Sequence, residues 1–139
     1  MSPPEAEPPT SVRLSYLDSS AFVKLFWREP ESEALRVALP GVTVSSDLLV
    51  IEALRVARRL DPEAPDRAEL ELRGVNLIPI SQQVRDTAAR IGPAGLRSLD
   101  AVHLATAHLL GDRIDAFLSY DERLGEAAAA LGFTVLAPA

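Results

Sequence analysis

The chain has 139 residues, of which 47% are hydrophobic and 24% charged, a composition typical of one ordinary globular domain. Its formal net charge of −6 argues against broad electrostatic binding to nucleic acid, although bound cations can reverse the field of an acidic site locally. The absence of cysteine excludes a disulfide framework and a thiolate zinc site, and it favours the cytoplasm. Apolar runs break after a few residues and the first residues lack a signal-peptide pattern, so no membrane segment is expected.

The predicted elements alternate short strands with helices. A Pro-rich start, residues 1–11, is predicted to be a disordered tail, and residues 12–139 are predicted to form one domain. The expected strands are short and rich in Val, Ile, Leu or Phe, and cover 14–17, 42–45, 75–80, 116–119 and 134–136. The expected helices cover 20–28, 31–38, 47–60, 63–73, 82–91, 98–110 and 122–131. Strands separated by helices favour parallel βαβ units with right-handed crossovers, and therefore a three-layer α/β/α sandwich.

Polar residues stand where several of these helices begin. Ser98 is expected to cap the helix 98–110, and Asp121 the last helix. Either Ser46 or Asp47 is expected to cap the helix 47–60.

Four carboxylates lie at the edges of apolar segments: Asp18, Glu52, Asp100 and Asp121. Asp18 and Asp121 follow predicted strands, and ligands of open parallel sheets bind outside the carboxyl ends of strands, where the strand order reverses. Glu52 lies along the apolar stripe of its helix, and Asp100 lies in the first turn of a helix that is apolar almost all round. A buried carboxylate costs several kcal/mol unless it is compensated, and hard divalent cations prefer oxygen ligands. The four acids therefore predict a site for Mg²⁺ or Mn²⁺.

Three of these acids also have a purely structural interpretation. Asp100 and Asp121 stand where helix caps and partners of the helix dipole occur. Asp18 stands where a turn residue commonly follows a strand.

Other residues near the acids have similar alternatives. Glu52 has no capping role in mid-helix, and its alternative is an ion pair with Arg55 or Arg59. The group Arg55, Arg58 and Arg59 is expected to be a solvated helix face. His103, one turn after Asp100, is expected to be a hydrogen-bonded core residue rather than a metal ligand. The apolar residues of the segment 22–27 are expected to lie in the core or in a subunit contact.

The segments around the four acids resemble PIN-domain proteins, and closely the VapC-type toxins of toxin–antitoxin pairs. The segments that carry the resemblance are 16–25, 50–53, 96–105 and 118–124, each with one of the acids. The resemblance extends over roughly residues 13–137. It implies a five-stranded parallel sheet in the order 3-2-1-4-5, which would place Asp18 and Asp121 side by side at the switch point.

What the resemblance implies is a Mg²⁺- or Mn²⁺-dependent endoribonuclease that hydrolyses RNA phosphodiester bonds and leaves 5′-phosphate and 3′-hydroxyl ends. The acidic quartet of the family maps onto Asp18, Glu52, Asp100 and Asp121, with Ser20 and Ser119 as supporting hydroxyls. All but Glu52 are expected to be direct metal ligands, and Glu52 either a ligand or the residue that orients the attacking water. The resemblance also implies a homodimer and a cognate antitoxin, whose C-terminal segment would bring a basic side chain into the acidic groove.

Two other functions remain open from the sequence. A metal-assisted phosphatase would use Asp18 as its covalent nucleophile, although the haloacid-dehalogenase-like version has a second Asp where Ser20 stands. A non-catalytic PIN-like interaction module would usually have lost one of the acids, and all four are present.

Overall fold

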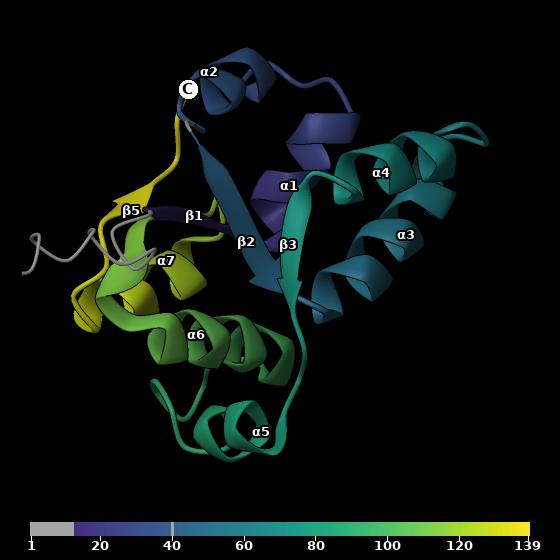
Figure 1. Cartoon of the computed structure of the whole chain (residues 1–139). Coiled ribbons are helices and arrows are strands. Elements are labelled where there is room, and N and C mark those ends of the chain that lie inside the picture. Colours follow the sequence, from purple (N-terminus) through teal and green to yellow (C-terminus); the bar gives the residue numbers. More distant parts are fainter. Residues whose placement is uncertain (1–12, 40) are drawn as a thin grey trace, which may run out of the picture.

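The structure, a computed structural model, describes residues 13–39 and 41–139 (Figure 1). The predicted disordered tail, residues 1–11, lies outside the described residues. The strands are β1 (Leu14–Leu17), β2 (Val42–Ser46), β3 (Val75–Ile78), β4 (Ile114–Leu118) and β5 (Val135–Leu136). The helices are α1 (Ser19–Phe26), α2 (Ser32–Val37), α3 (Leu48–Leu60), α4 (Ala64–Leu72), α5 (Gln82–Ala88), α6 (Ser98–Leu110), the 3₁₀ helix η2 (Gly111–Arg113) and α7 (Glu122–Ala130). Within this part of the chain no helix has both the length and the apolar character that crossing a membrane requires.

The five strands form one parallel sheet in the order β3-β2-β1-β4-β5. The central strand, β1, pairs with β2 on one side and β4 on the other, so that Tyr16 lies opposite both Val44 and Phe117. The strand order reverses at β1, and the carboxyl ends of β1 and β4 form the switch point of the sheet. The predicted fold class and strand order are confirmed.

Helices cover both faces of the sheet, which gives the three layers (Figure 1). Because successive strand residues point to opposite faces, Tyr16 and Leu17 belong to different cores. The core that contains Leu17 is filled from α1, α2, α3 and α4, for example by the fully buried Phe22 and Leu49. The core that contains Tyr16 is filled from α6 and α7, for example by Leu104, while α5 packs against α6.

The helix α3 shows how the sequence pattern positions a residue of interest. Leu49, Ala53 and Ala57 recur at intervals of four and are fully buried in the first core. The arginines of this helix are exposed, as expected of a solvated face. Glu52 lies between these two faces, at the edge of the buried stripe, and its side chain is 14% exposed.

Several elements end earlier than predicted, and β3 and α5 have a clear cause in the sequence. β3 ends at Ile78 instead of residue 80, because Pro79 has no N–H to donate to a neighbouring strand. α5 ends at Ala88 instead of residue 91, because the chain turns through Gly92, whose φ is +73°, into a second proline, Pro93.

The predicted caps are partly correct. Asp121 caps α7, as predicted. Ser98 does not cap α6, because it is already the first helical residue and its side chain makes no capping bond. At α3, the hydroxyl of Ser46 accepts a hydrogen bond from the N–H of Leu48 at 3.1 Å, whereas Asp47 makes no side-chain capping bond.

Candidate active site

Asp18 and Asp121 lie at the two strand ends that meet at the switch point. Asp18 follows β1 directly, and its N–H donates to the carbonyl oxygen of Leu118 at 3.2 Å, which continues the pairing with β4 by one residue. Asp121 is the third residue after β4 and the residue before α7. The strand order therefore brings together two acids that are far apart in the sequence.

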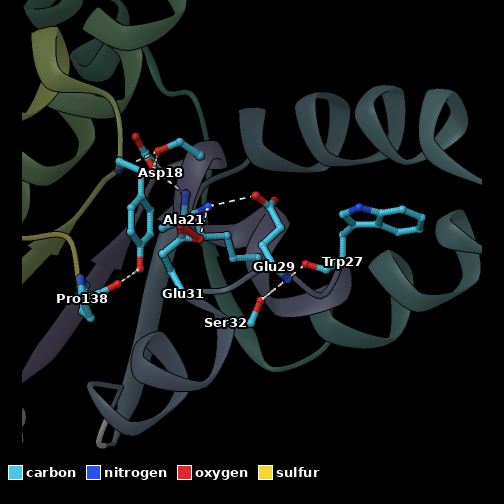
Figure 2. A network of polar contacts seen from close by, with 10 residues as sticks. Asp18, Ala21, Trp27, Glu29, Glu31, Ser32 and Pro138 are labelled. Atoms are coloured by element: carbon cyan, nitrogen blue, oxygen red, sulfur yellow. Dashed lines mark hydrogen bonds and ion pairs between the residues drawn. The ribbon is translucent and has the colours of Figure 1, made fainter.

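The carboxylate of Asp18 is buried, and both of its oxygens accept hydrogen bonds; Figure 2 shows Asp18 beside Ala21, one of the donors. Oδ1 accepts from the hydroxyl of Ser20 at 2.7 Å and from the N–H of Ala21 at 2.9 Å, so that Asp18 is the N-cap of α1. Oδ2 accepts from the hydroxyl of Ser119. Because each carboxylate oxygen has two lone pairs, Oδ2 retains one that can bind a cation.

Ser20 and Ser119 tie the end of β1 to the turn between β4 and α7. The oxygen of Ser20 accepts from the N–H of Tyr120 at 2.9 Å while its hydrogen goes to Asp18. The oxygen of Ser119 accepts from the N–H of Asp121 at 3.1 Å and its hydrogen also goes to Asp18. Each hydroxyl thus joins Asp18 to the turn that carries the second strand-end acid.

The structural interpretation of Asp121 as a cap is correct, and it occupies one oxygen only. Oδ1 of Asp121 accepts from the N–H of Leu124 at 3.0 Å. Asp100 lies in the first turn of α6 and is half-buried. Asp18, Asp100 and Asp121 therefore all stand at the N-termini of helices, where the positive end of the helix dipole favours negative charge.

The fourth acid, Glu52, has a partner that the sequence did not predict. Its Oε1 lies 2.6 Å from Nε2 of His103, which is on α6. Neither Arg55 nor Arg59 forms an ion pair with Glu52 in the described part of the chain, and both arginines are exposed. The predicted alternative for Glu52 is therefore wrong, because its partner comes from another helix.

The surroundings of Asp18 change its pKa in two opposite directions. Burial raises the pKa of Asp18 above its usual value, and hydrogen bonds from Ser119, Ser20 and the backbone of Ala21 oppose this rise. A buried carboxylate that is held by three donors is poised to keep its charge once a cation is near.

Burial and the charges of the other three acids raise the pKa of Asp100. Burial is the largest cause that raises its pKa, followed by the negative charge of Asp121, and the charges of Asp18 and Glu52 add to the rise. A positive charge on His103, if its imidazole were protonated, would act in the opposite direction. The four acids, contributed by two strand ends and two helices, therefore form one electrostatic site.

No basic side chain of the Lys or Arg type neutralises this site within residues 13–39 and 41–139. Lys24, the single lysine of the chain, lies close by on α1 but forms ion pairs with Glu29 at 3.1 Å and Glu31 at 3.0 Å (Figure 2). Its ammonium also lies 4.6 Å from the centre of the Tyr120 ring. The site thus has unbalanced negative charge that a cation from outside the chain would balance.

The donor set suits a hard divalent cation, since it consists of carboxylate and hydroxyl oxygens. Among the described residues, however, no three acidic or histidine side chains are already arranged as a ready-made set of metal ligands. Asp100 makes no side-chain hydrogen bond in this part of the chain, so no such bond holds its carboxylate in place. The residues fit a cation by the chemistry of their oxygen donors and by their charge.

Two polar residues beside the acids, His103 and Tyr16, were not predicted as part of the site. Their side chains are buried, and they are linked by a hydrogen bond of 2.8 Å between the Tyr16 hydroxyl and Nδ1 of His103. The spacing of His103, three residues after Asp100, indicates that both lie on the same face of α6 and could have identified it. No comparable sequence signal distinguishes Tyr16 from the other core residues of β1.

A comparison with protein-family models gives one family for nearly the whole domain. The model of the PIN domain matches residues 15–130. The chain therefore belongs to the PIN-domain family.

Similar curated proteins give the group within the family. The ribonuclease VapC46 of Mycobacterium tuberculosis is 42% identical over 125 residues, which cover 88% of this chain and 96% of that protein. The ribonuclease VapC47 of the same species is 38% identical over 130 residues, with the same shares covered. The resemblance to VapC-type proteins that the sequence indicated is confirmed.

Solved structures support the same fold. A toxin–antitoxin complex from Klebsiella pneumoniae contains a chain with a TM-score of 0.68 and 21% identity, over 90% of this chain and 98% of that one. The toxin VapC20 of Mycobacterium tuberculosis gives a TM-score of 0.69 at 18% identity, over 90% of this chain and 99% of that one. At these identities the similarity establishes the fold.

Proposed function

We propose that this protein is a metal-dependent endoribonuclease and the toxin of a type II toxin–antitoxin pair. The predicted enzyme class is confirmed by relatives that are named ribonucleases and that the chain matches over 96% of their length. The observation that carries the residue assignment is the group of four acids at the switch point, which influence one another's charge and have no Lys or Arg partner among the described residues.

In this proposal Asp18, Asp100 and Asp121 hold Mg²⁺ or Mn²⁺ through carboxylate oxygens, and Glu52 either adds a ligand or orients the attacking water. Such a cation, when bound, neutralises charge on the scissile phosphate and acidifies the water that attacks it. Ser20 and Ser119 position Asp18: their hydrogen bonds hold its carboxylate in one orientation, so that it needs no reorganisation during the reaction. The positive N-termini of α1, α6 and α7 favour the ionised state of the acids.

The phosphatase alternative is disfavoured by the surroundings of Asp18. A covalent nucleophile must reach the phosphorus atom, whereas Asp18 is 2% exposed and accepts three hydrogen bonds. The position of the second acid that this chemistry would use is Ser20, whose hydroxyl is bound to Asp18 itself. The alternative of a non-catalytic module is disfavoured by the presence of all four acids in one electrostatic site.

The proposed partners follow from the same site. A cluster of carboxylates that binds a cation also accepts a guanidinium, so a basic side chain from an antitoxin segment can occupy it in place of the metal. A toxin–antitoxin complex from Klebsiella pneumoniae contains a chain of the same fold, which supports an antitoxin as partner. We further propose that the protein acts as a homodimer, and that it works in the cytoplasm, where RNA substrates are made.

A cleavage assay tests the proposal directly. The purified protein is incubated with a structured RNA or with a small phosphomonoester, each with Mn²⁺ or with EDTA. Cleavage of RNA alone, dependent on Mn²⁺ and lost in an Asp18→Asn/Asp121→Asn variant, is expected. Hydrolysis of the monoester but not of RNA would show that the phosphatase alternative is correct. RNA cleavage that persists in the double variant would remove these acids from the mechanism.

A further inference from the structure

Glu52, His103 and Tyr16 form a buried chain of hydrogen bonds that joins α3, α6 and β1. Nε2 of His103 lies 2.6 Å from Oε1 of Glu52, and Nδ1 lies 2.8 Å from the Tyr16 hydroxyl. The histidine side chain is 1% exposed and that of Glu52 is 14% exposed. This series of hydrogen bonds therefore runs from Tyr16 in the interior of the domain to Glu52 in the acidic site.

The chemistry of the three groups gives each hydrogen bond a direction. An ionised carboxylate only accepts hydrogen bonds, so Nε2 of His103 carries a hydrogen and donates it to Glu52. Burial raises the pKa of Tyr16, so its hydroxyl keeps its hydrogen and can donate it to Nδ1. A neutral imidazole with its hydrogen on Nε2 satisfies both contacts at once.

The imidazole ring is fixed by packing as well as by these bonds. The Tyr16 ring stacks on Phe117 with centres 5.1 Å apart and an angle of 10° between the planes. The same ring meets His103 edge to face, with centres 5.8 Å apart and an angle of 81°. Because the imidazole is fixed, its hydrogen bond holds the flexible Glu52 side chain in one orientation. Glu52 therefore loses its conformational entropy when the protein folds, and not when a cation or substrate binds.

We propose that His103, held in place by Tyr16, is a positioning residue for Glu52: it occupies Oε1 and leaves Oε2 for the cation or for the attacking water. The inference rests on the proposed function, since it assigns a role to Glu52 in that reaction. Oε2 makes no hydrogen bond within the described residues, whereas Oε1 lies 2.6 Å from Nε2 of the ring. Partners of this kind, which orient metal-site residues without touching the metal, typically change affinity or activity about 10- to 100-fold when removed.

Kinetics of four variants test the role. His103→Leu removes both hydrogen bonds and keeps an apolar volume, while His103→Gln offers an amide N–H near the position of Nε2. Tyr16→Phe removes only the hydroxyl, and His108→Leu changes the second, exposed histidine of α6 as a matched control. With RNA and saturating Mn²⁺, His103→Leu is expected to lower kcat about 10- to 100-fold with KM for RNA little changed. Tyr16→Phe should give a smaller loss, and His103→Gln should recover most of kcat.

Wild-type kcat in the folded His103→Leu variant, or equal losses in the Leu and Gln variants, would overturn the inference. A fall in kcat of the His108→Leu control equal to that of His103→Leu would overturn it as well. Circular dichroism shows whether each variant folds. If His103→Leu does not fold, kcat of His103→Gln and Tyr16→Phe is compared with that of the wild type, because each of these variants keeps a polar or aromatic group of nearly the same shape. A wild-type kcat in Tyr16→Phe, or a larger loss in His103→Gln than in Tyr16→Phe, would then overturn the inference.

A spectroscopic measurement separates this inference from the proposed function. The chain has two histidines, so ¹⁵N NMR of the ring nitrogens in metal-free protein gives two sets of signals, with His108 as internal reference. A hydrogen on Nε2 of His103, and a shift of its signals but not those of His108 in Glu52→Gln, are expected. A hydrogen on Nδ1 alone, or no response to Glu52→Gln, would overturn the positioning role even if the enzyme cleaves RNA. An enzyme without Mn²⁺-dependent cleavage would instead overturn the proposed function, whatever the NMR result.

Discussion

Ser119 donates its hydroxyl hydrogen to Oδ2 of Asp18, a residue 101 positions earlier in the chain. The hydroxyl oxygen of Ser119 accepts a hydrogen bond from the N–H of Asp121, so one small side chain holds both strand-end acids. Ser119 is buried, and water cannot easily replace it. The relative position of the two strand-end acids therefore depends on the hydroxyl group of Ser119 as well as on the carboxylates themselves.

Replacing Ser119 tests this dependence. Ser119→Ala leaves the buried Asp18 short of one donor, and the loss of a hydrogen bond to a charged group costs about 1.5–3 kcal/mol of unfolding free energy. The pKa of Asp18 should rise further, since this hydrogen bond lowers it. Urea unfolding measures the first effect, and a drop in RNA cleavage of about tenfold is expected with it. Ser119→Thr keeps the hydroxyl and serves as control; if it behaves like the Ala variant, packing rather than the hydrogen bond is responsible.

Asp100→Asn should separate activity from stability. The substitution removes one negative charge from a group in which Asp121, Asp18 and Glu52 all oppose the ionisation of Asp100. In metal-free buffer the melting temperature should stay the same or rise, because like-charge repulsion is relieved. Mn²⁺-dependent cleavage should fall by about a hundredfold or more, since stabilisation of the transition-state charge is worth several kcal/mol. Asp112→Asn, on the exposed η2, is the matched control and should change neither quantity.

Divalent cations should stabilise the folded chain by linkage. A cation that binds the folded state alone adds about 2.7 kcal/mol at a free concentration of about 100 times its Kd. For a domain of this size the melting temperature should rise on the order of 8 °C. Differential scanning calorimetry with Mn²⁺ and after EDTA measures the rise, which should disappear in the Asp18→Asn/Asp121→Asn variant. Equal shifts in the two proteins would place the stabilising ion elsewhere.

The raised pKa of Asp100 gives a dependence on pH with a defined sign. The folded state binds this proton more tightly than the unfolded chain, whose carboxyl has its usual pKa of 3.8. The stabilisation from protonation is fully present below that value and is lost as pH rises through the higher pKa of the folded state. In metal-free buffer the wild type should therefore lose stability relative to Asp100→Asn as the pH rises above about 4 and through the pKa of the folded state. Unfolding free energies measured in urea across this range check the trend, and a difference that shrinks with rising pH would contradict it.

Much of the fold was predictable because strands and helices differ in their periodicity. Uninterrupted apolar runs such as that of β1 indicated strands that are buried on both faces, and hence a parallel sheet between helices. The start of β4 was placed two residues late because Asp115 interrupts the apolar pattern. Asp115 is exposed and pairs with Arg13 at 3.1 Å, so the charge lies at the surface of a genuine strand.

The acids were predictable from their places in these elements, but their partners were not. Asp18 and Asp121 follow strands, and the strand order alone brings them together. The contact between Glu52 and His103 joins residues 51 positions apart on different helices, and it depends on how the N-terminal halves of α3 and α6 lie relative to one another. Local spacing offered Arg55 or Arg59 of the same helix as the alternative partner of Glu52, because sequence patterns report neighbours within an element and not across elements.

The position of β1 has a consequence for the synthesis of the protein. β1 is made well before β4, yet it is the middle strand of the sheet and pairs with β4, which begins only at Ile114. A nascent chain that has not reached β4 has Asp18 but lacks Ser119 and Asp121. Domains generally fold as units when the last strand that they need has been made. The acidic site therefore cannot assemble before β4 and the turn after it have been made, and an inhibitor that recognises the assembled acids needs to capture only molecules that have passed this point.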